Sequence, residues 1–156
     1  MSFTPTTKTG EVLQEAMKAA TSAGNPDIRP GHILVALLEQ KEGIAAPLLE
    51  AAGVNPSGVL TRAKELVAGY PSASGANMAN PQFNRDAVNA LNAAEELAGE
   101  LGDEYVSTEI LLIGVATGQS EAATVLQSAG ATAEALKGAL TSVRGSRKVT
   151  TENPEE

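Results

Sequence analysis

Few side chains in this sequence have the types and spacing that catalysis requires. The 156 residues include one histidine, His32, and no cysteine. A lone histidine cannot build a metal cluster, and without cysteine there is no thiolate nucleophile. His32 follows Pro30 and Gly31 at a predicted helix start, so we interpret it as a capping or packing residue. We therefore expect no catalytic residue and no metal or cofactor site in this chain.

The carboxylates between residues 103 and 109 are the other candidates for chemistry. Asp103, Glu104 and Glu109 could form paired carboxylates for acid–base catalysis. No pocket motif accompanies them, and a solvated acidic edge is the favoured interpretation. Ser107 is placed to cap a helix, with Glu109 in its first turn. Because the sequence also contains no phosphate-binding Gly-rich loop ending in Gly-Lys-Ser or Gly-Lys-Thr, we do not expect the chain to hydrolyse nucleotide.

The helices that would position these side chains come from an internal repeat. Shifting the sequence by 78 residues aligns similar positions of its two halves, and after a one-residue deletion the shift becomes 77. A period of this length indicates that one supersecondary unit was duplicated, and that the copies pack face to face around a pseudo-two-fold axis. Function is then expected at their junction. Aligned pairs include Leu13 with Leu91, Ala16 with Ala94, Gly24 with Gly102, Leu34 with Leu112, Leu49 with Leu126 and Gly53 with Gly130.

Apolar residues at helical spacing predict four helices in each repeat. Pro30 and the pair Asn55-Pro56 open helices in the first repeat, while Ser107 and Ser120 do so in the second. The expected fold is all-α, with about eight helices in two related four-helix repeats. The expected divisions are repeat one at 3–68, a connecting loop at 69–82, repeat two at 83–146 and a flexible linker stub at 147–156.

Composition and charge argue against some classes of binding partner. The formal net charge is −8, which argues against a nucleic-acid backbone as ligand. Apolar residues make up 42% of the chain and aromatic residues 3%, so the core is expected to be aliphatic. No apolar run approaches the length of a membrane span, and the first ten residues do not resemble a secretion signal. We expect a cytoplasmic protein that contacts neither membrane nor nucleic acid and is monomeric in isolation.

Several short segments, taken together with the repeat, carry a family resemblance. They are Thr6-Thr7-Lys8, Ile28-Arg29-Pro30-Gly31-His32-Ile33-Leu34, Ala45-Ala46-Pro47-Leu48-Leu49, Tyr70-Pro71, Gly102-Asp103-Glu104-Tyr105-Val106-Ser107-Thr108-Glu109 and Arg144-Gly145. Over nearly its whole length the chain resembles the amino-terminal (Clp repeat) domain of the Clp AAA+ unfoldases. These segments are more similar to the branch of bacterial disaggregases than to the protease-coupled branches.

The resemblance implies a chaperone module that binds exposed apolar segments of unfolded or aggregated proteins and passes them to a hexamer of ATPase rings. ATP and Mg²⁺ would bind in those rings, outside this chain. The implied partners are protein clients, the homohexamer and a DnaK-type chaperone system. Two alternatives remain, an adaptor-docking domain of a protease-coupled Clp ATPase and a stand-alone helical scaffold. The full open reading frame would discriminate among them.

Six positions match functional positions of that family. Thr6, Asp103 and Glu109 match its functional Thr, Asp and Glu. The apolar client-binding patch corresponds to Leu91, Leu97 and Ile110, which at helical spacing could equally be core. If the first three residues form one surface cluster, the segment before the first helix must lie against the loop at 102–107. The Thr6 hydroxyl could then donate a hydrogen bond to a carboxylate.

Overall fold

A computed structural model describes residues 3–72, 80–145 and 148–150. Over these residues the chain forms eight helices, as predicted, and none of them is long and apolar enough to span a membrane. The helices are α1 (Thr7–Ser22), α2 (Pro30–Glu39), α3 (Ala45–Ala51), α4 (Pro56–Ala68), α5 (Arg85–Leu101), α6 (Thr108–Ala116), α7 (Glu121–Ser128) and α8 (Ala133–Arg144).

The two halves of the fold repeat the same local structure. Helices α2 and α6 begin at Pro30 and Thr108, which are 78 residues apart, and α4 and α8 begin 77 residues apart. Side chains cap both first helices, since Thr6 accepts a hydrogen bond from the Thr9 amide and Asn84 accepts one from the Ala87 amide. The predicted duplication and all-α fold class are therefore confirmed.

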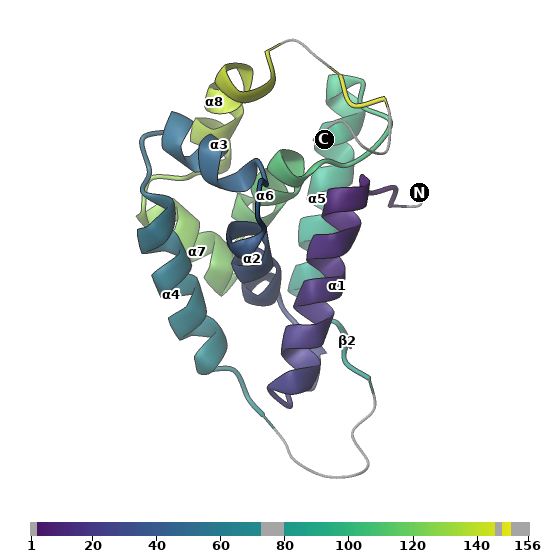
Figure 1. Ribbon diagram of the computed structural model, residues 1–156, viewed down its shortest axis with the longest axis vertical. Helices are drawn as coiled ribbons and strands as arrows, with labels where there is room; N and C mark the ends of the chain where they lie inside the picture. The colour runs from purple at the N-terminus through teal and green to yellow at the C-terminus, as the bar shows by residue number, and fades with distance from the viewer. Residues whose placement is uncertain (1–2, 73–79, 146–147, 151–156) are drawn as a thin grey trace.

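Two very short parallel pairings, which the sequence analysis did not predict, tie the repeats together. Strand β1 (Asp27–Ile28) pairs with β2 (Gln82–Phe83), placing Ile28 opposite Phe83, and Pro5 forms an isolated bridge with Val106. The two pairings are related by the same 78-residue shift. Each one joins the segment before the first helix of one repeat to the segment after the first helix of the other. Helices α1 and α5 are thus tied at both ends and run antiparallel along one side of the molecule (Figure 1).

The core lies between the repeats and is built around α2 and α6. Every residue of α6 from Thr108 to Ala116 is buried, as are seven of the ten residues of α2. A helix that is apolar all round needs neighbours on every side, which explains the central position of α6 in Figure 1. The core side chains are aliphatic, in agreement with the composition. Its largest members include Ile33, Leu34, Leu37, Ile110, Leu111, Leu112 and Ile113.

The first two helices of each repeat pack differently in the two halves. A Cβ atom added to Gly114 of α6 would lie 2.5 Å from the carbonyl oxygen of Ala90 and 2.9 Å from the Cβ of Ala94, so α5 and α6 are in very close contact. Ala36 occupies the corresponding position in the first repeat. There α1 and α2 leave a cavity between them. The two halves therefore differ at this position, with a very close helix contact at Gly114 and a cavity lined by Ala36.

Candidate functional site

A buried ion cluster joins the loop between α5 and α6, the first turn of α6 and the end of α8. We call its members, Asp103, Ser107, Glu109 and Arg144, the Arg144 cluster. Arg144 Nη1 donates to both oxygens of Asp103, at 3.0 and 2.9 Å. Its Nε donates to Glu109 Oε2 at 3.0 Å, and its Nη2 donates to Ser107 Oγ at 3.1 Å. The planar guanidinium group suits this arrangement because it presents several donors in fixed directions.

All three charges of the Arg144 cluster are removed from solvent. The side chains of Asp103, Glu109 and Arg144 are 0%, 3% and 7% exposed. Two carboxylates around one guanidinium leave the cluster with a net negative charge, and Glu109 Oε1 is buried with no hydrogen-bond partner. The predicted solvated acidic edge is therefore wrong for Asp103 and Glu109. Each is held by a buried cation that lies 35 or more residues away along the chain.

Ser107 lies at the predicted helix start, but its hydroxyl group does not cap the helix. Ser107 is the N-cap residue of α6, yet its side chain makes no capping hydrogen bond. The hydroxyl oxygen instead accepts from Arg144. Glu109 lies in the first turn of this helix, where a negative charge interacts favourably with the helix dipole.

Thr6 lies near residues 102–107 as predicted, but its hydroxyl group has a different partner. The Thr6 amide donates to the Val106 carbonyl at 3.0 Å, and the Val106 amide donates to the Thr4 carbonyl at 2.8 Å. The predicted hydrogen bond from Thr6 to a carboxylate is wrong, because the Thr6 hydroxyl donates to Thr9 Oγ1 at 3.0 Å. The hypothesis of a surface cluster is wrong as well, since Thr6 is 1% exposed.

The three apolar candidates for client binding differ in exposure. Ile110 is fully buried and Leu97 is 8% exposed, so both belong to the core in this conformation. Leu91 is partly exposed on α5 and packs against the edge of the core. Of the three, Leu91 has the most accessible side chain.

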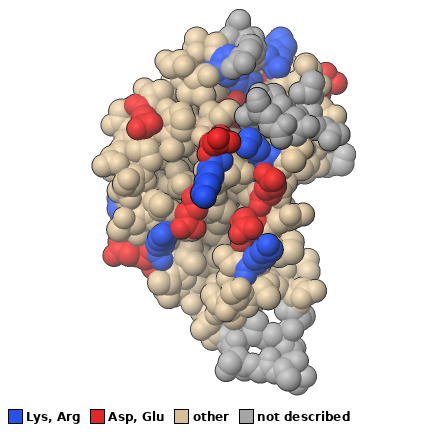
Figure 2. Space-filling model, in the orientation of Figure 1, with Lys and Arg blue, Asp and Glu red and all other residues tan. Residues whose placement is uncertain are grey.

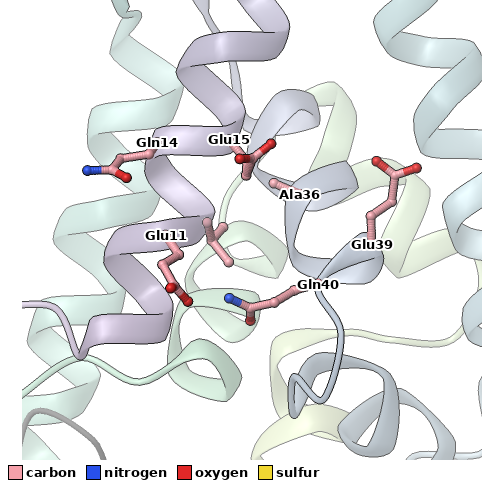
Figure 3. A pocket seen from close by; sticks show the side chains of 7 residues that line it. Glu11, Gln14, Glu15, Ala36, Glu39 and Gln40 are labelled. Carbon is pink, nitrogen blue, oxygen red and sulfur yellow. The ribbon is translucent and has the colours of Figure 1, made fainter.

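The first repeat carries a cavity of about 430 Å³ between α1 and α2. Glu11 and Glu15 project from α1, and Gln40 follows α2 at the lower end of the cavity (Figure 3). The Gln40 side-chain amide donates to the Lys8 carbonyl at 2.9 Å, which joins the ends of the two helices. Acidic and basic side chains gather in the middle of this face of the molecule (Figure 2). The sequence analysis missed this cavity, which is lined by Ala36 at the position equivalent to Gly114.

His32 is a packing residue, as the sequence indicated. The Arg29 amide donates to its Nδ1 at 2.9 Å, and its Nε2 lies 2.8 Å from Asn25 Oδ1. With Nδ1 as acceptor, Nε2 carries the proton and the ring is neutral. The ring packs against Tyr70, with 5.0 Å between the ring centroids, and Arg29 lies over the same tyrosine ring. Burial lowers the pKa of His32 and raises the pKa of Tyr70 to about 12.

Acidification should therefore destabilise the fold through His32. An unfolded histidine has a pKa of about 6.5, and the folded value is lower, so between these two values the unfolded chain binds more protons and stability falls as pH falls. We expect His32→Gln to lose roughly 1–3 kcal/mol at pH 7.5 through its hydrogen bonds. The difference in unfolding free energy between wild type and His32→Gln should shrink on going to pH 5. Urea titrations at both pH values measure it, and a constant difference would contradict the assignment.

Comparisons with known proteins agree on one family. The model of the Clp repeat (R) N-terminal domain matches residues 4–129. The chain is 65% identical over 154 residues to the chaperone protein ClpB of Corynebacterium glutamicum, covering 99% of this chain and 18% of that relative. It therefore spans about a fifth of the relative's length.

Solved structures of similar fold have little sequence identity. The Hsp104 N-terminal domain from Candida albicans matches with a TM-score of 0.83 and 17% identity, over 98% of this chain and 99% of that one. A ClpV N-domain in complex with a VipB peptide matches with a TM-score of 0.71 and 17% identity, over 94% of this chain and 91% of that one. At this level of identity these likenesses show the fold.

Proposed function

Because the chain belongs to the family of Clp repeat N-terminal domains, we propose that it is the client-engaging domain of an ATP-dependent disaggregase. In this proposal it captures exposed apolar segments of unfolded or aggregated proteins and passes them to hexameric ATPase rings, where ATP and Mg²⁺ bind. A DnaK-type chaperone system would cooperate with the whole protein. The high identity to ClpB supports the disaggregase branch, and the VipB peptide bound by a ClpV N-domain supports peptide capture by this fold.

The observation that carries the proposal is the pair of apolar stripes on α1 and α5. Met17 and Val88 are 41% and 42% exposed and are the large apolar side chains left exposed among the described residues. Met17 lies one turn after Leu13, and Val88 lies one turn before Leu91. Leu13 and Leu91 are equivalent positions of the two repeats, and both are partly buried. In this proposal clients contact the stripes of α1 and α5, whose flanking segments pair with each other, and Leu97 and Ile110 do not have to leave the core.

Substituting the exposed members of the stripes should weaken client binding without unfolding the domain. Each exposed side chain can bury about 50 Å² against a client, which contributes roughly 1.2 kcal/mol, a little under tenfold in affinity. We expect Met17→Ser combined with Val88→Ser to weaken binding at least about tenfold. The measurement is an amide chemical-shift titration with reduced, carboxymethylated α-lactalbumin, a permanently unfolded protein, alongside thermal melts.

Leu60→Ser on α4 is the matched control, because Leu60 is partly exposed but lies on a different helix. It should leave client affinity unchanged within about twofold. Equal binding by wild type and the Met17/Val88 double variant would contradict the α1–α5 surface. Shifts confined to the cavity residues Glu11, Glu15 and Gln40 would move the client site to the first repeat's α1–α2 cavity.

A further inference from the structure

The segment that follows α8 is bound to the domain by three polar contacts. The Val149 amide donates to Asp103 Oδ1 at 2.9 Å, and the Glu104 amide donates to the Val149 carbonyl at 2.7 Å. Lys148 Nζ donates to the Leu101 carbonyl at 3.0 Å. The Val149 side chain is 5% exposed. Residues 148–150, here called the exit segment, therefore dock on the loop between α5 and α6, whereas chain segments after a last helix are commonly loose.

Asp103 connects the exit segment to the Arg144 cluster. Its two oxygens accept from Arg144, and Oδ1 also accepts from Val149. With its side chain 0% exposed and its oxygens engaged in this way, Asp103 presents nothing that a client could contact. We propose that Asp103 is a positioning residue, which together with Arg144 fixes the point at which the chain leaves the domain. The positioning role rests on these contacts alone, and its consequence for client delivery rests on the proposed function.

The point of departure matters because it sets how far the domain can move relative to whatever follows it. With the exit segment docked, the last residue held by a hydrogen bond is Val149. Without this contact the chain is free from the end of α8 at residue 144, and five more residues add up to roughly 17 Å of reach. Reach and linker length determine the effective concentration of a tethered binding domain near its target. Asp103 can therefore influence client delivery without touching a client.

The Arg144 cluster is well placed to hold this point rigidly. Arg144 lies in the last turn of α8, where a cation interacts favourably with the helix dipole. Its partners come from the residues after α5 and the first turn of α6. The cluster and the exit segment thus share Asp103, and loss of Asp103 removes the acceptor for Val149 and one of the two carboxylates that hold Arg144.

The test uses amide hydrogen exchange and ¹⁵N relaxation on the 156-residue chain without any client. In Asp103→Ala we expect the Val149 amide to exchange about 10- to 100-fold faster, the effect of losing a hydrogen bond to a charged acceptor. In Val149→Pro, which removes the amide donor and leaves the Arg144 cluster intact, the Glu104 amide should lose protection in the same way. Glu104→Gln is the matched control, because it alters an exposed carboxylate and keeps the Glu104 amide.

Disaggregation activity is then measured in a chimera, in which this domain replaces the matching region of Corynebacterium glutamicum ClpB. We expect Val149→Pro and Asp103→Ala to slow disaggregation by similar factors, while client affinity of the isolated chain stays within about twofold. A protected Val149 amide in folded Asp103→Ala would overturn the proposal. So would a Val149→Pro variant that frees the exit segment yet disaggregates at the wild-type rate. If Asp103→Ala does not fold, Val149→Pro alone decides, and neither result depends on the Met17/Val88 titration.

Discussion

Arg144→Ala is expected to destabilise the isolated chain by about 3–5 kcal/mol, a large part of the stability of a domain of this size. Removing the guanidinium leaves Asp103 and Glu109 buried beside each other without their cation. The penalty comes mainly from these uncompensated charges and exceeds the net contribution of the ion pairs themselves. Urea unfolding at pH 7 followed by circular dichroism measures the change.

Lys64→Ala is the matched control for this loss of a cation. Lys64 contacts Glu39 at 2.9 Å, the same distance as the shorter Arg144–Asp103 contact, but both side chains are about half exposed. Such pairs contribute roughly 0–1 kcal/mol because water and salt screen them. If both variants lost similar amounts of stability, burial would not be the cause, and the Arg144 cluster would count as an ordinary surface network.

Much of the fold could be predicted because each signal was local. Pro30, Asn55 and Ser120 mark the starts of their helices through conformational preferences that act within one turn, and the repeat supported the same division into four helices in both halves. The pairings of Ile28 with Phe83 and of Pro5 with Val106 were missed, because two residues of strand carry no periodicity.

The site was harder to predict because its contacts join distant residues. Asp103 and Glu109 were identified as candidates through the family resemblance, but their partner Arg144 comes 41 and 35 residues later. Without a pocket motif near residues 103–109, the sequence favoured a solvated acidic edge, whereas packing of α8 brings the cation of Arg144 to Asp103 and Glu109. Likewise, helical spacing places Leu91 and Leu97 on one helix, and only tertiary packing separates the partly exposed residue from the buried one.

The close contact between α5 and α6 predicts a second large effect. A single methyl group added at Gly114 should lower the free energy of unfolding. Gly114→Ala would place Cβ 2.5 Å from the Ala90 carbonyl oxygen, which is a backbone atom and cannot rotate away. The two helices must separate, and overpacking of this kind costs roughly 1–3 kcal/mol. Helix propensity alone would favour alanine by about 1 kcal/mol, so the sign of the result separates the two effects. Thermal and urea unfolding both report it.

Gly99→Ala on α5 is the control that isolates the contact. Gly99 is exposed, and a Cβ there meets no atom within 4 Å, so we expect a gain of about 0.5–1 kcal/mol from helix propensity. Opposite signs for the two glycine variants would show that Gly114 is needed for close packing of α5 on α6. A stabilising Gly114→Ala would contradict that account.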